Sequence, residues 1–230
     1  MRRNREFQRM RLLPGPFRRA ATRVARSGSL TLALAAFGEA AEPPRPCFDF
    51  SLKIVDPLST PIPRVEGRDN SAFGTYPNGI DWAAGRALVE MPIGALYAKL
   101  LDHRNVKDMK KTTLSTTVLE RPGYLDFHHV DVVVLVRALF VRVKVAWTEE
   151  WGYSLVEGTR EAPRKIVVSY QKIGGTGFIK HQCGSYVLQA HDEATTDLSL
   201  YEEVKADHRS AEDTRNMHAG ILRNLRGQGP

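Results

Sequence analysis

The sequence predicts an α+β fold in which a seven-stranded, curved antiparallel sheet wraps on a long C-terminal helix, with two short helices after the first strand. Two observations predict it. Six consecutive segments within residues 113–206 alternate apolar and polar residues, and the chain closes with one amphipathic stretch at residues 210–225. Consecutive strands joined by short turns form an antiparallel meander, whose apolar face needs a cover. The terminal helix is the element that can supply this cover.

The first strand is expected at residues 86–91, and Pro92 then opens a helix, as proline does at a first helical position. Asp102 is the expected N-cap of a second short helix that runs to about Lys111. The first helix carries four apolar residues at helical spacing on one face: Leu96, Tyr97, Leu100 and Leu101.

The other six strands follow without a further helix between them. They are expected at residues 113–120, 124–136, 140–156, 164–173, 178–190 and 195–206. Turn residues separate most of them, at residues 121–123, 157–158, 174–175 and 191–192. The junction near residues 137–139 contains no Gly or Pro, so the sequence does not define its turn.

The last helix has recognisable signals at both ends. Ser210 and Asp213 form a start that resembles a capping box, with Asp in place of the usual Glu, and Gly227 stands where a helix stops. Its apolar face consists of Thr214, Met217, Ile221, Leu222 and Leu225. Because one helix cannot fill the concave face of seven strands, we expect a cavity between the two, of the kind that small apolar ligands occupy.

The charge of the 230-residue chain is concentrated at its beginning. The net charge is +7, but residues 1–46 hold ten Arg against three Glu, and the remaining chain holds 23 basic and 23 acidic residues. Binding of a phosphate backbone needs a surplus of Lys and Arg on the folded surface. We therefore expect no nucleic-acid partner. The expected parts are a basic leader with a Pro-rich linker (1–46), an extended lead-in (47–79) and a ligand-binding domain (80–228).

The leader has the features of a secretory signal. A basic head precedes an apolar stretch at residues 30–37, and Gly38 and Ala40 occupy the −3 and −1 positions of a small-residue cleavage site. We therefore expect export to a periplasm or to the outside. The alternatives are a disordered basic tail or an upstream start codon, and the protein is then cytoplasmic. No apolar run reaches the roughly 18 residues that span a bilayer, so we expect no transmembrane segment, while transient membrane contact and the oligomeric state stay open.

The two cysteines, Cys47 and Cys183, can pair in an oxidising compartment. Because Cys47 lies in the N-terminal linker, we expect two independent buried thiols instead. His181 and Cys183 share a face of their strand, but no third ligand comes at usable spacing, so no metal site is expected. His128 and His129 are adjacent in a strand and point to opposite faces, so they cannot chelate one ion.

The chain resembles the START-like, or helix-grip, superfamily, which includes polyketide cyclases and dehydrases, coenzyme Q-binding proteins and Bet v 1-like proteins. The likeness covers about residues 80–228. It is carried by "ALVEMPIGALYAKLLDHRNVKDM" (87–109), "VAWTEEWGYSL" (145–155), "IVVSYQKIGGTGFIKHQCGSYVL" (166–188), "TDLSLYEEVKA" (196–206) and "ILRNL" (221–225). The Val-rich run at 132–145 departs from the pattern. The resemblance implies binding of a lipid or another hydrophobic ligand, and it carries over no catalytic residue. We expect no cofactor.

Glu149 is the most informative candidate residue. Alternation in the strand around it sets the row Val145, Trp147, Glu149, Trp151 and Tyr153 toward the core, so one carboxylate lies on the apolar face. Burial of an unpaired carboxylate is expensive, so Glu149 must be paired, protonated or directed into a wet cavity. One hypothesis is that it hydrogen-bonds the polar end of a ligand. The alternative is a bulge that turns it outward or a pair with an internal Arg or Lys.

The remaining candidates are side chains that either line the cavity or simply fill the core. Tyr170 either places its hydroxyl in the cavity or packs as a core tyrosine bonded to the backbone. The candidates for the ligand wall are Trp147, Trp151, Tyr153, Val168, Met217 and Ile221. Gly174–Gly177 precede a strand rather than a helix, which favours a hairpin turn over a phosphate-binding loop.

Three functions are compatible with these features. The first is a non-enzymatic carrier or sensor of a hydrophobic small molecule such as a lipid, a quinone or a polyketide-like compound. The second is a cyclase or dehydratase that uses Glu149 as general base, with Tyr170 or a His as acid. The third is an interaction module whose exposed partner surface is the Val-rich run at residues 130–146.

Overall fold

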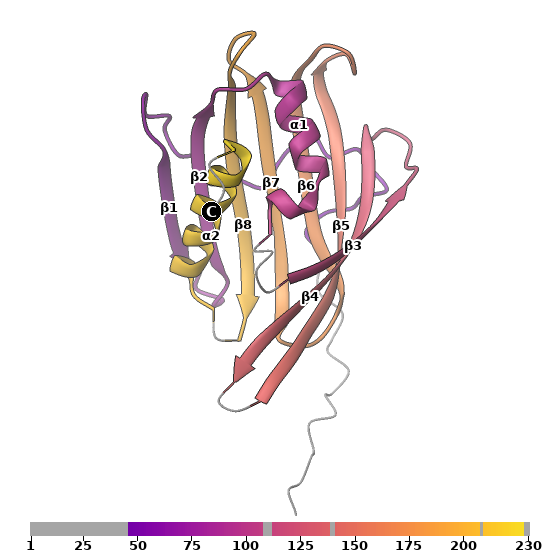
Figure 1. Ribbon diagram of the computed structural model, residues 1–230, viewed down its shortest axis with the longest axis vertical. Helices are drawn as coiled ribbons and strands as arrows, with labels where there is room; N and C mark the ends of the chain where they lie inside the picture. Colours follow the sequence, from indigo (N-terminus) through magenta and orange to yellow (C-terminus); the bar gives the residue numbers. More distant parts are fainter. Residues whose placement is uncertain (1–45, 108–111, 139–140, 208, 228–230) are drawn as a thin grey trace, which may run out of the picture. The chain divides into compact units, whose positions relative to one another are not determined.

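The computed structural model describes residues 46–107, 112–138, 141–207 and 209–227 (Figure 1). In this part, eight strands form one antiparallel sheet with the spatial order β1-β2-β8-β7-β6-β5-β4-β3. The strands are β1 (Asn70–Thr75), β2 (Asp81–Val89), β3 (Thr112–Leu119), β4 (Asp126–Ala138), β5 (Val141–Gly158), β6 (Pro163–Gly175), β7 (Ile179–Ala190) and β8 (Thr196–Ala206). The helices are α1 (Ile93–Leu101), the single 3-10 turn η1 (His103–Asn105) and α2 (Ala211–Leu225).

The predicted fold class is confirmed, but the sheet has eight strands and not seven. The additional strand is β1, which pairs with β2 from Asn70↔Arg86 to Thr75↔Asp81. It lies inside the stretch that we expected to be an extended lead-in. Its sequence, NSAFGT, is short and lacks a row of large apolar residues, so alternation gives no signal there.

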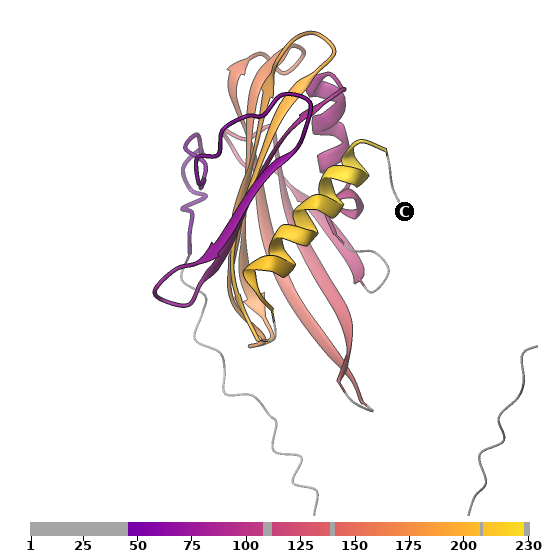
Figure 2. The same ribbon diagram turned by 90° about the vertical axis from the view of Figure 1, so that its left-hand side faces the viewer.

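Both helices lie on one face of the curved sheet, which we call the inner face (Figure 2). The capping box that opens α2 is confirmed. The Asp213 amide donates to Ser210 Oγ at 3.2 Å, and the Ser210 amide donates to Asp213 Oδ2 at 2.9 Å. Because α2 is anchored at this start, its apolar stripe is directed at the sheet, and Ile221, Leu222 and Leu225 are buried there.

The main core lies between the inner face and the helices. It contains apolar and aromatic side chains from α1, α2 and strands β2 and β4–β8. Its largest fully buried members are Trp151, Tyr153, Tyr170 and Tyr186. Strands β4 and β5 stay in register up to Ala138↔Val141, on either side of the junction that the sequence left undefined. Residues 139–140 within it, the end of the predicted second helix (108–111) and the leader up to residue 45 lie outside the described residues.

The opposite face, which we call the outer face, is crossed by the N-terminal segment (Figure 2). The amides of Cys47 and Phe48 donate to Gln171 Oε1 at 2.7 and 2.9 Å, and Gln171 Nε2 donates back to the Phe48 carbonyl at 3.0 Å. The Phe50 ring packs edge-on against Phe127, with centroids 5.4 Å apart. The segment is therefore held by hydrogen bonds between its backbone and the Gln171 side chain, and by a second, small apolar cluster.

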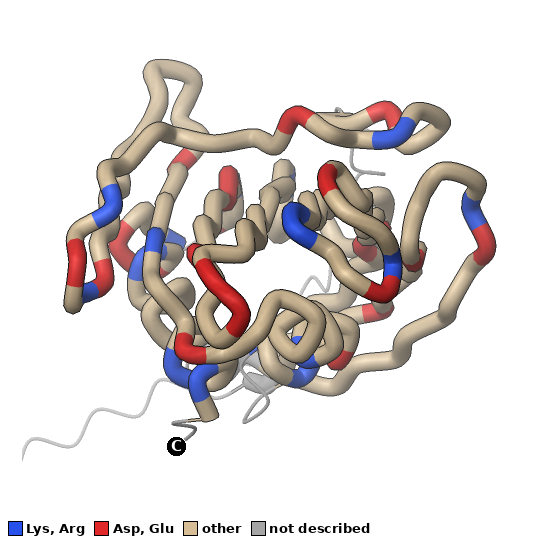
Figure 3. Tube along the Cα trace, turned by 90° about the horizontal axis from the view of Figure 1, so that it is seen from above, with Lys and Arg blue, Asp and Glu red and all other residues tan. Residues whose placement is uncertain are grey.

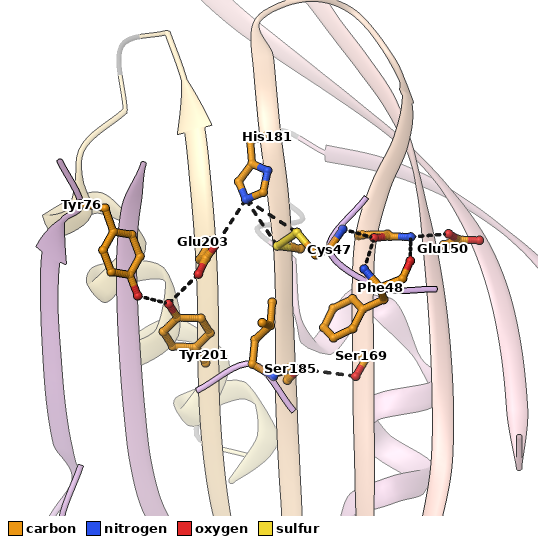
Figure 4. Close-up of a disulfide and its surroundings, with 12 residues drawn as sticks. Cys47, Phe48, Tyr76, Glu150, Ser169, His181, Ser185, Tyr201 and Glu203 are labelled. Atoms are coloured by element: carbon orange, nitrogen blue, oxygen red, sulfur yellow. Dashed lines mark hydrogen bonds and ion pairs between the residues drawn. A yellow bond between two sulfur atoms is a disulfide. The ribbon is translucent and has the colours of Figure 1, made fainter. Parts of the chain in front are cut away.

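This docking brings the two cysteines together. Cys47 and Cys183 form a disulfide across a sequence separation of 136 residues (Figure 4). The expectation of two independent thiols is wrong, because residue 47 does not lie in an unattached linker but on the outer face of β7.

Charged residues of both signs are interspersed along the described chain, without a separate basic side (Figure 3). This distribution agrees with the equal numbers of basic and acidic residues after residue 46. Among the described residues, no helix has the length and apolar character needed to cross a bilayer.

Candidate functional site

The inner face brings together the side chains that the sequence singled out. Trp151, Tyr153, Val168, Tyr170 and Ile221 belong to the main core, and Trp147 and Met217 pack against its edge. Trp151 and Tyr170 stack with ring centroids 4.3 Å apart, and Tyr186 lies 5.6 Å from Tyr170. The rings of Trp151, Tyr170 and Tyr186 thus form one aromatic cluster within this face.

Glu149 is completely buried and has three donors. Lys107 Nζ and Trp147 Nε1 each donate to its Oε1 at 2.7 Å, and Trp151 Nε1 donates to its Oε2 at 2.9 Å. A register shift between Thr148 and Glu149 marks a bulge, but the carboxylate stays on the inner face. The sequence left open whether Glu149 binds a ligand, turns outward at a bulge or pairs with an internal Arg or Lys. In the structure it pairs with Lys107.

Lys107, which sequence reasoning did not identify, follows η1 and lies over the aromatic cluster. Its Nζ is 5.6 Å from the ring centroid of Trp151 and 5.9 Å from that of Tyr170. These distances permit cation–π attraction. The ion pair with Glu149 therefore fixes the loop after η1 onto β5, and Glu149 has no oxygen without a donor.

A second buried carboxylate, Glu202 on β8, lies next to α2. Gln182 Nε2 donates to Glu202 Oε1 at 3.0 Å, Arg209 contacts Oε2 at 3.4 Å, and His218 Nε2 lies 3.7 Å from Oε2. We call these four residues the His218 cluster. Glu202 and His218 are both fully buried, so the cluster lies inside the fold and not on its surface.

The His218 cluster contains polar atoms without a partner. Both ring nitrogens of His218 and the Oε1 of Gln182 are buried and form no hydrogen bond among the described residues. Burial lowers the pKa of His218 to about 4, more than the neighbouring Glu202 carboxylate raises it, so the ring is neutral at pH 7. Most buried polar groups in folded proteins are hydrogen-bonded. The unpaired atoms of the His218 cluster are therefore an exception to this rule.

The pKa of Tyr170 is affected by both buried carboxylates. Burial raises its pKa well above the usual value, and the Glu202 and Glu149 carboxylates raise it further, so the hydroxyl stays protonated. Gly184 makes this position possible. A Cβ on Gly184 would lie 2.5 Å from the Tyr170 hydroxyl oxygen and 2.4 Å from the Tyr201 carbonyl oxygen. Because Gly184 pairs with Glu202 in the β7–β8 register, the hydroxyl lies beside the His218 cluster.

The histidines of β4 lie on opposite faces, as alternation predicts. His128 Nδ1 lies 3.0 Å from His103 Nε2 on the inner face, whereas His129 is directed at Glu150 on the other side, at 3.9 Å. Burial, together with His128 and Lys107, lowers the pKa of His103 to about 3.

Two signals in the sequence point to the residues that were missed. Glu202 lies in the inward row Leu198, Leu200, Glu202 and Val204, which is the same pattern that singled out Glu149. His218 lies four residues before Leu222, on the apolar stripe of α2. Arg209, Gln182 and Lys107 have no comparable signal, because their partners come from other elements.

The described residues also line two pockets at the surface. One, of about 550 Å³, opens beside the end of α2 and is lined by Gly67, Arg68, Asp69, Leu88, Val89, Glu90, Met91 and Arg226. The other, of about 510 Å³, lies at the turn between β3 and β4. Val130, Val132 and Val145 of the Val-rich run are buried, while Leu135 is half exposed.

The structure brings two further potential ligands to His181 and Cys183, although none comes at usable spacing in the sequence. Cys47 and Glu203 join them, and the four ligand atoms lie within 4.8 Å of one another (Figure 4). Neither of the additional residues is near His181 in sequence, so spacing could not reveal them.

No protein-family model matches the chain, and no curated protein matches it. The solved structures include similar folds. The human StarD13 (DLC2) lipid transfer and protein localization domain has a TM-score of 0.52 at 9% identity, over 78% of this chain and 91% of that one. A STAR-related lipid transfer protein from Xanthomonas axonopodis has a TM-score of 0.46 at 13% identity, over 69% and 97%. The ZhuI aromatase/cyclase from Streptomyces sp. R1128 has a TM-score of 0.42 at 15% identity, over 65% and 93%.

The StarD13 domain, with a TM-score of 0.52, has the same fold as this chain. A curved antiparallel sheet with a capped C-terminal helix across its inner face defines the arrangement. This chain has the helix-grip fold.

Proposed function

We propose that this protein binds a largely apolar small molecule between the inner face of the sheet and α2, with a polar group of that molecule directed at the His218 cluster. The observation that carries the proposal is the set of buried polar atoms without partners, namely both nitrogens of His218 and the Oε1 of Gln182. A ligand with a hydroxyl, carbonyl or carboxyl group would supply these partners. Each such bond would recover part of the roughly 1–3 kcal/mol that an unsatisfied buried group costs.

The apolar part of the ligand would contact the aromatic cluster. Trp151, Tyr170 and Tyr186 offer flat apolar surface next to the His218 cluster. Each Å² of apolar ligand surface removed from water contributes roughly 25 cal/mol, so a lipid-sized molecule needs no covalent chemistry to bind. The fold supports this proposal as well, since the similar human domain is named for lipid transfer.

Ligand entry requires a movement. The rings of the aromatic cluster contact one another, and α2 covers β1, β2 and β8. A ligand must therefore part α2 from these strands. Hydrogen exchange of the α2 amides should slow on binding, because a ligand held under α2 links the helix to the sheet.

The test is native mass spectrometry of the protein incubated with a total lipid extract of its own host. We expect a one-to-one adduct that organic extraction removes. In His218→Leu the adduct should weaken at least tenfold, because one polar contact is lost, whereas His191→Leu, at an exposed turn position, should bind like the wild type. Absence of an adduct with the wild type, or equal binding by both variants, would overturn the proposal.

A cyclase or dehydratase activity is the second candidate, and one observation favours it. Glu202, His218 and the Tyr170 hydroxyl meet in one buried place, which is the convergence of titratable groups that acid–base catalysis needs. In this case Glu202 would be the base and not Glu149, since three donors hold Glu149. Turnover of a β-hydroxyacyl or poly-β-ketoacyl thioester that is lost in Glu202→Gln would support it. If the wild type does not convert these thioesters, cyclase or dehydratase activity on them is excluded.

A further inference from the structure

Four side chains that can bind a metal meet on the outer face, on the side of the sheet opposite the His218 cluster. They are Cys47, His181, Cys183 and Glu203, and we call them the outer-face cluster (Figure 4). His181 Nε2 is at the centre of this arrangement. It lies 3.7 Å from Cys47 Sγ, 3.4 Å from Cys183 Sγ and 3.2 Å from Glu203 Oε2.

These separations are close to the edges of a zinc coordination tetrahedron. With zinc–sulfur bonds of about 2.3 Å and zinc–nitrogen or zinc–oxygen bonds of about 2.0–2.1 Å, neighbouring ligand atoms are about 3.3–3.8 Å apart. The three distances from His181 Nε2 lie at or near these values. All four ligand atoms lie within 4.8 Å of one another. The two sulfur atoms, which are bonded to each other, must separate, and reduction of the disulfide permits this.

A second shell already orients the carboxylate. The Tyr201 hydroxyl donates to Glu203 Oε1 at 2.9 Å, which leaves Oε2 directed at His181. The hydroxyl oxygens of Tyr76 and Tyr201 are 2.7 Å apart, so Tyr201 is itself held in place. Partners of this kind fix the geometry of metal ligands and are typical of metal sites.

The cluster is also accessible. Cys183 is fully buried, but the side chains of His181 and Glu203 are 16% and 19% exposed. An ion can therefore reach the ligands from solvent, while the buried thiolate is shielded. Two sulfurs, an imidazole and a carboxylate are ligands that zinc accepts, whereas calcium and magnesium prefer oxygen alone.

We propose that the reduced protein binds one zinc-type divalent cation through Cys47 Sγ, His181 Nε2, Cys183 Sγ and Glu203 Oε2. A dithiol reductant would transfer two electrons and two protons to the disulfide and itself become a cyclic disulfide. Binding of the cation would then release the two thiol protons. The two cysteines thus either form the disulfide or bind the metal. In both states Cys47 is linked to Cys183 on β7. The redox state of the compartment decides which one is present.

Cobalt is a spectroscopic probe for this site. The full chain is reduced with a phosphine, which becomes a phosphine oxide while water supplies its oxygen and the two thiol protons. It is then titrated with Co²⁺ under exclusion of oxygen. We expect one cobalt per chain, with a thiolate-to-metal charge-transfer band and the intense visible bands of tetrahedral cobalt, both abolished by added Zn²⁺. The oxidised protein should show neither band. A reduced, folded protein without the thiolate band would overturn the proposal.

Variants separate the cluster from nonspecific binding. Tyr201→Phe, which removes the second-shell donor, should weaken cobalt binding about 10–100-fold and keep the tetrahedral spectrum. Glu203→Gln should weaken it at least as much. Glu193→Gln, at an exposed position in the turn between β7 and β8, is the matched control and should bind like the wild type.

Equal cobalt affinity of Glu203→Gln and Glu193→Gln would contradict the proposed ligand set. Circular dichroism monitors the fold throughout. If reduction alone unfolds the chain, Zn²⁺ must restore the native spectrum, because metal binding is then coupled to folding. Failure to do so would equally overturn the proposal. None of these outcomes depends on the ligand proposed for the inner face.

Discussion

Replacement of His218 by Leu measures how much the unpaired imidazole ring lowers the free energy of unfolding. Both ring nitrogens are buried without a hydrogen-bond partner among the described residues. Each unsatisfied buried group costs roughly 1–3 kcal/mol, and an apolar side chain of similar shape avoids this cost. We therefore expect His218→Leu to be at least as stable as the wild type at pH 7 in urea unfolding, although it replaces a fully buried residue.

The difference between the two proteins should grow on acidification. The pKa of His218 is about 4 in the folded protein against an ordinary value of 6.5. The unfolded chain therefore binds the proton more readily, and the wild type loses stability as the pH falls from 6.5 toward 4. Between pH 7 and pH 5 this loss is about 2 kcal/mol. Glu202 and Arg209 are the charged groups beside the ring, and both are present in both proteins.

Urea unfolding at pH 7 and pH 5 of the wild type, His218→Leu and the exposed control His191→Leu measures this effect. His103, whose pKa is also lowered, contributes equally to all three proteins, so the comparison cancels it. The reasoning is refuted if the wild type and His218→Leu lose the same free energy between the two pH values. A large destabilisation of His218→Leu at pH 7 would show that the ring has partners that stabilise the fold.

Three further substitutions test the packing described above. Glu149→Gln should destabilise by about 3–5 kcal/mol in urea unfolding, because it leaves Lys107 unpaired in the core, and Glu157→Gln on the same strand should have little effect. Gly184→Ala should lower the free energy of unfolding by about 1–3 kcal/mol, because the added methyl group clashes with Tyr170. Gly94→Ala, with open space around it, should leave the stability unchanged or raise it. Equal effects of the two substitutions would contradict the close approach of Gly184 and Tyr170. Cys47→Ser should lower stability by about 4 kcal/mol and make thermal unfolding insensitive to reductant; a reductant effect of unchanged size in this variant would argue against the disulfide.

The sequence by itself determined most of the elements. Alternation with period two identified strands β2 to β8, although it placed the start of β2 several residues late, and Ser210 with Asp213 marked the beginning of α2. These signals are local, because a strand's faces and a helix's cap depend on residues within one element. The same alternation put Glu149 on the inner face, where the structure has it. Strand β1 was not predicted, because its six residues do not alternate in this way.

Only the tertiary structure decided how the elements meet. Glu149 pairs with Lys107 across 42 residues, Glu202 reaches His218 on another element, and Cys47 reaches Cys183 across 136. Such contacts depend on the register of the strands, the bulge in β5 and the path of the N-terminal segment over the outer face. The periodicity of the sequence indicates none of these three features. The chain's own pattern thus defines a sheet and its covering helix. The two polar clusters on its faces arise because folding brings together side chains whose partners are distant in sequence.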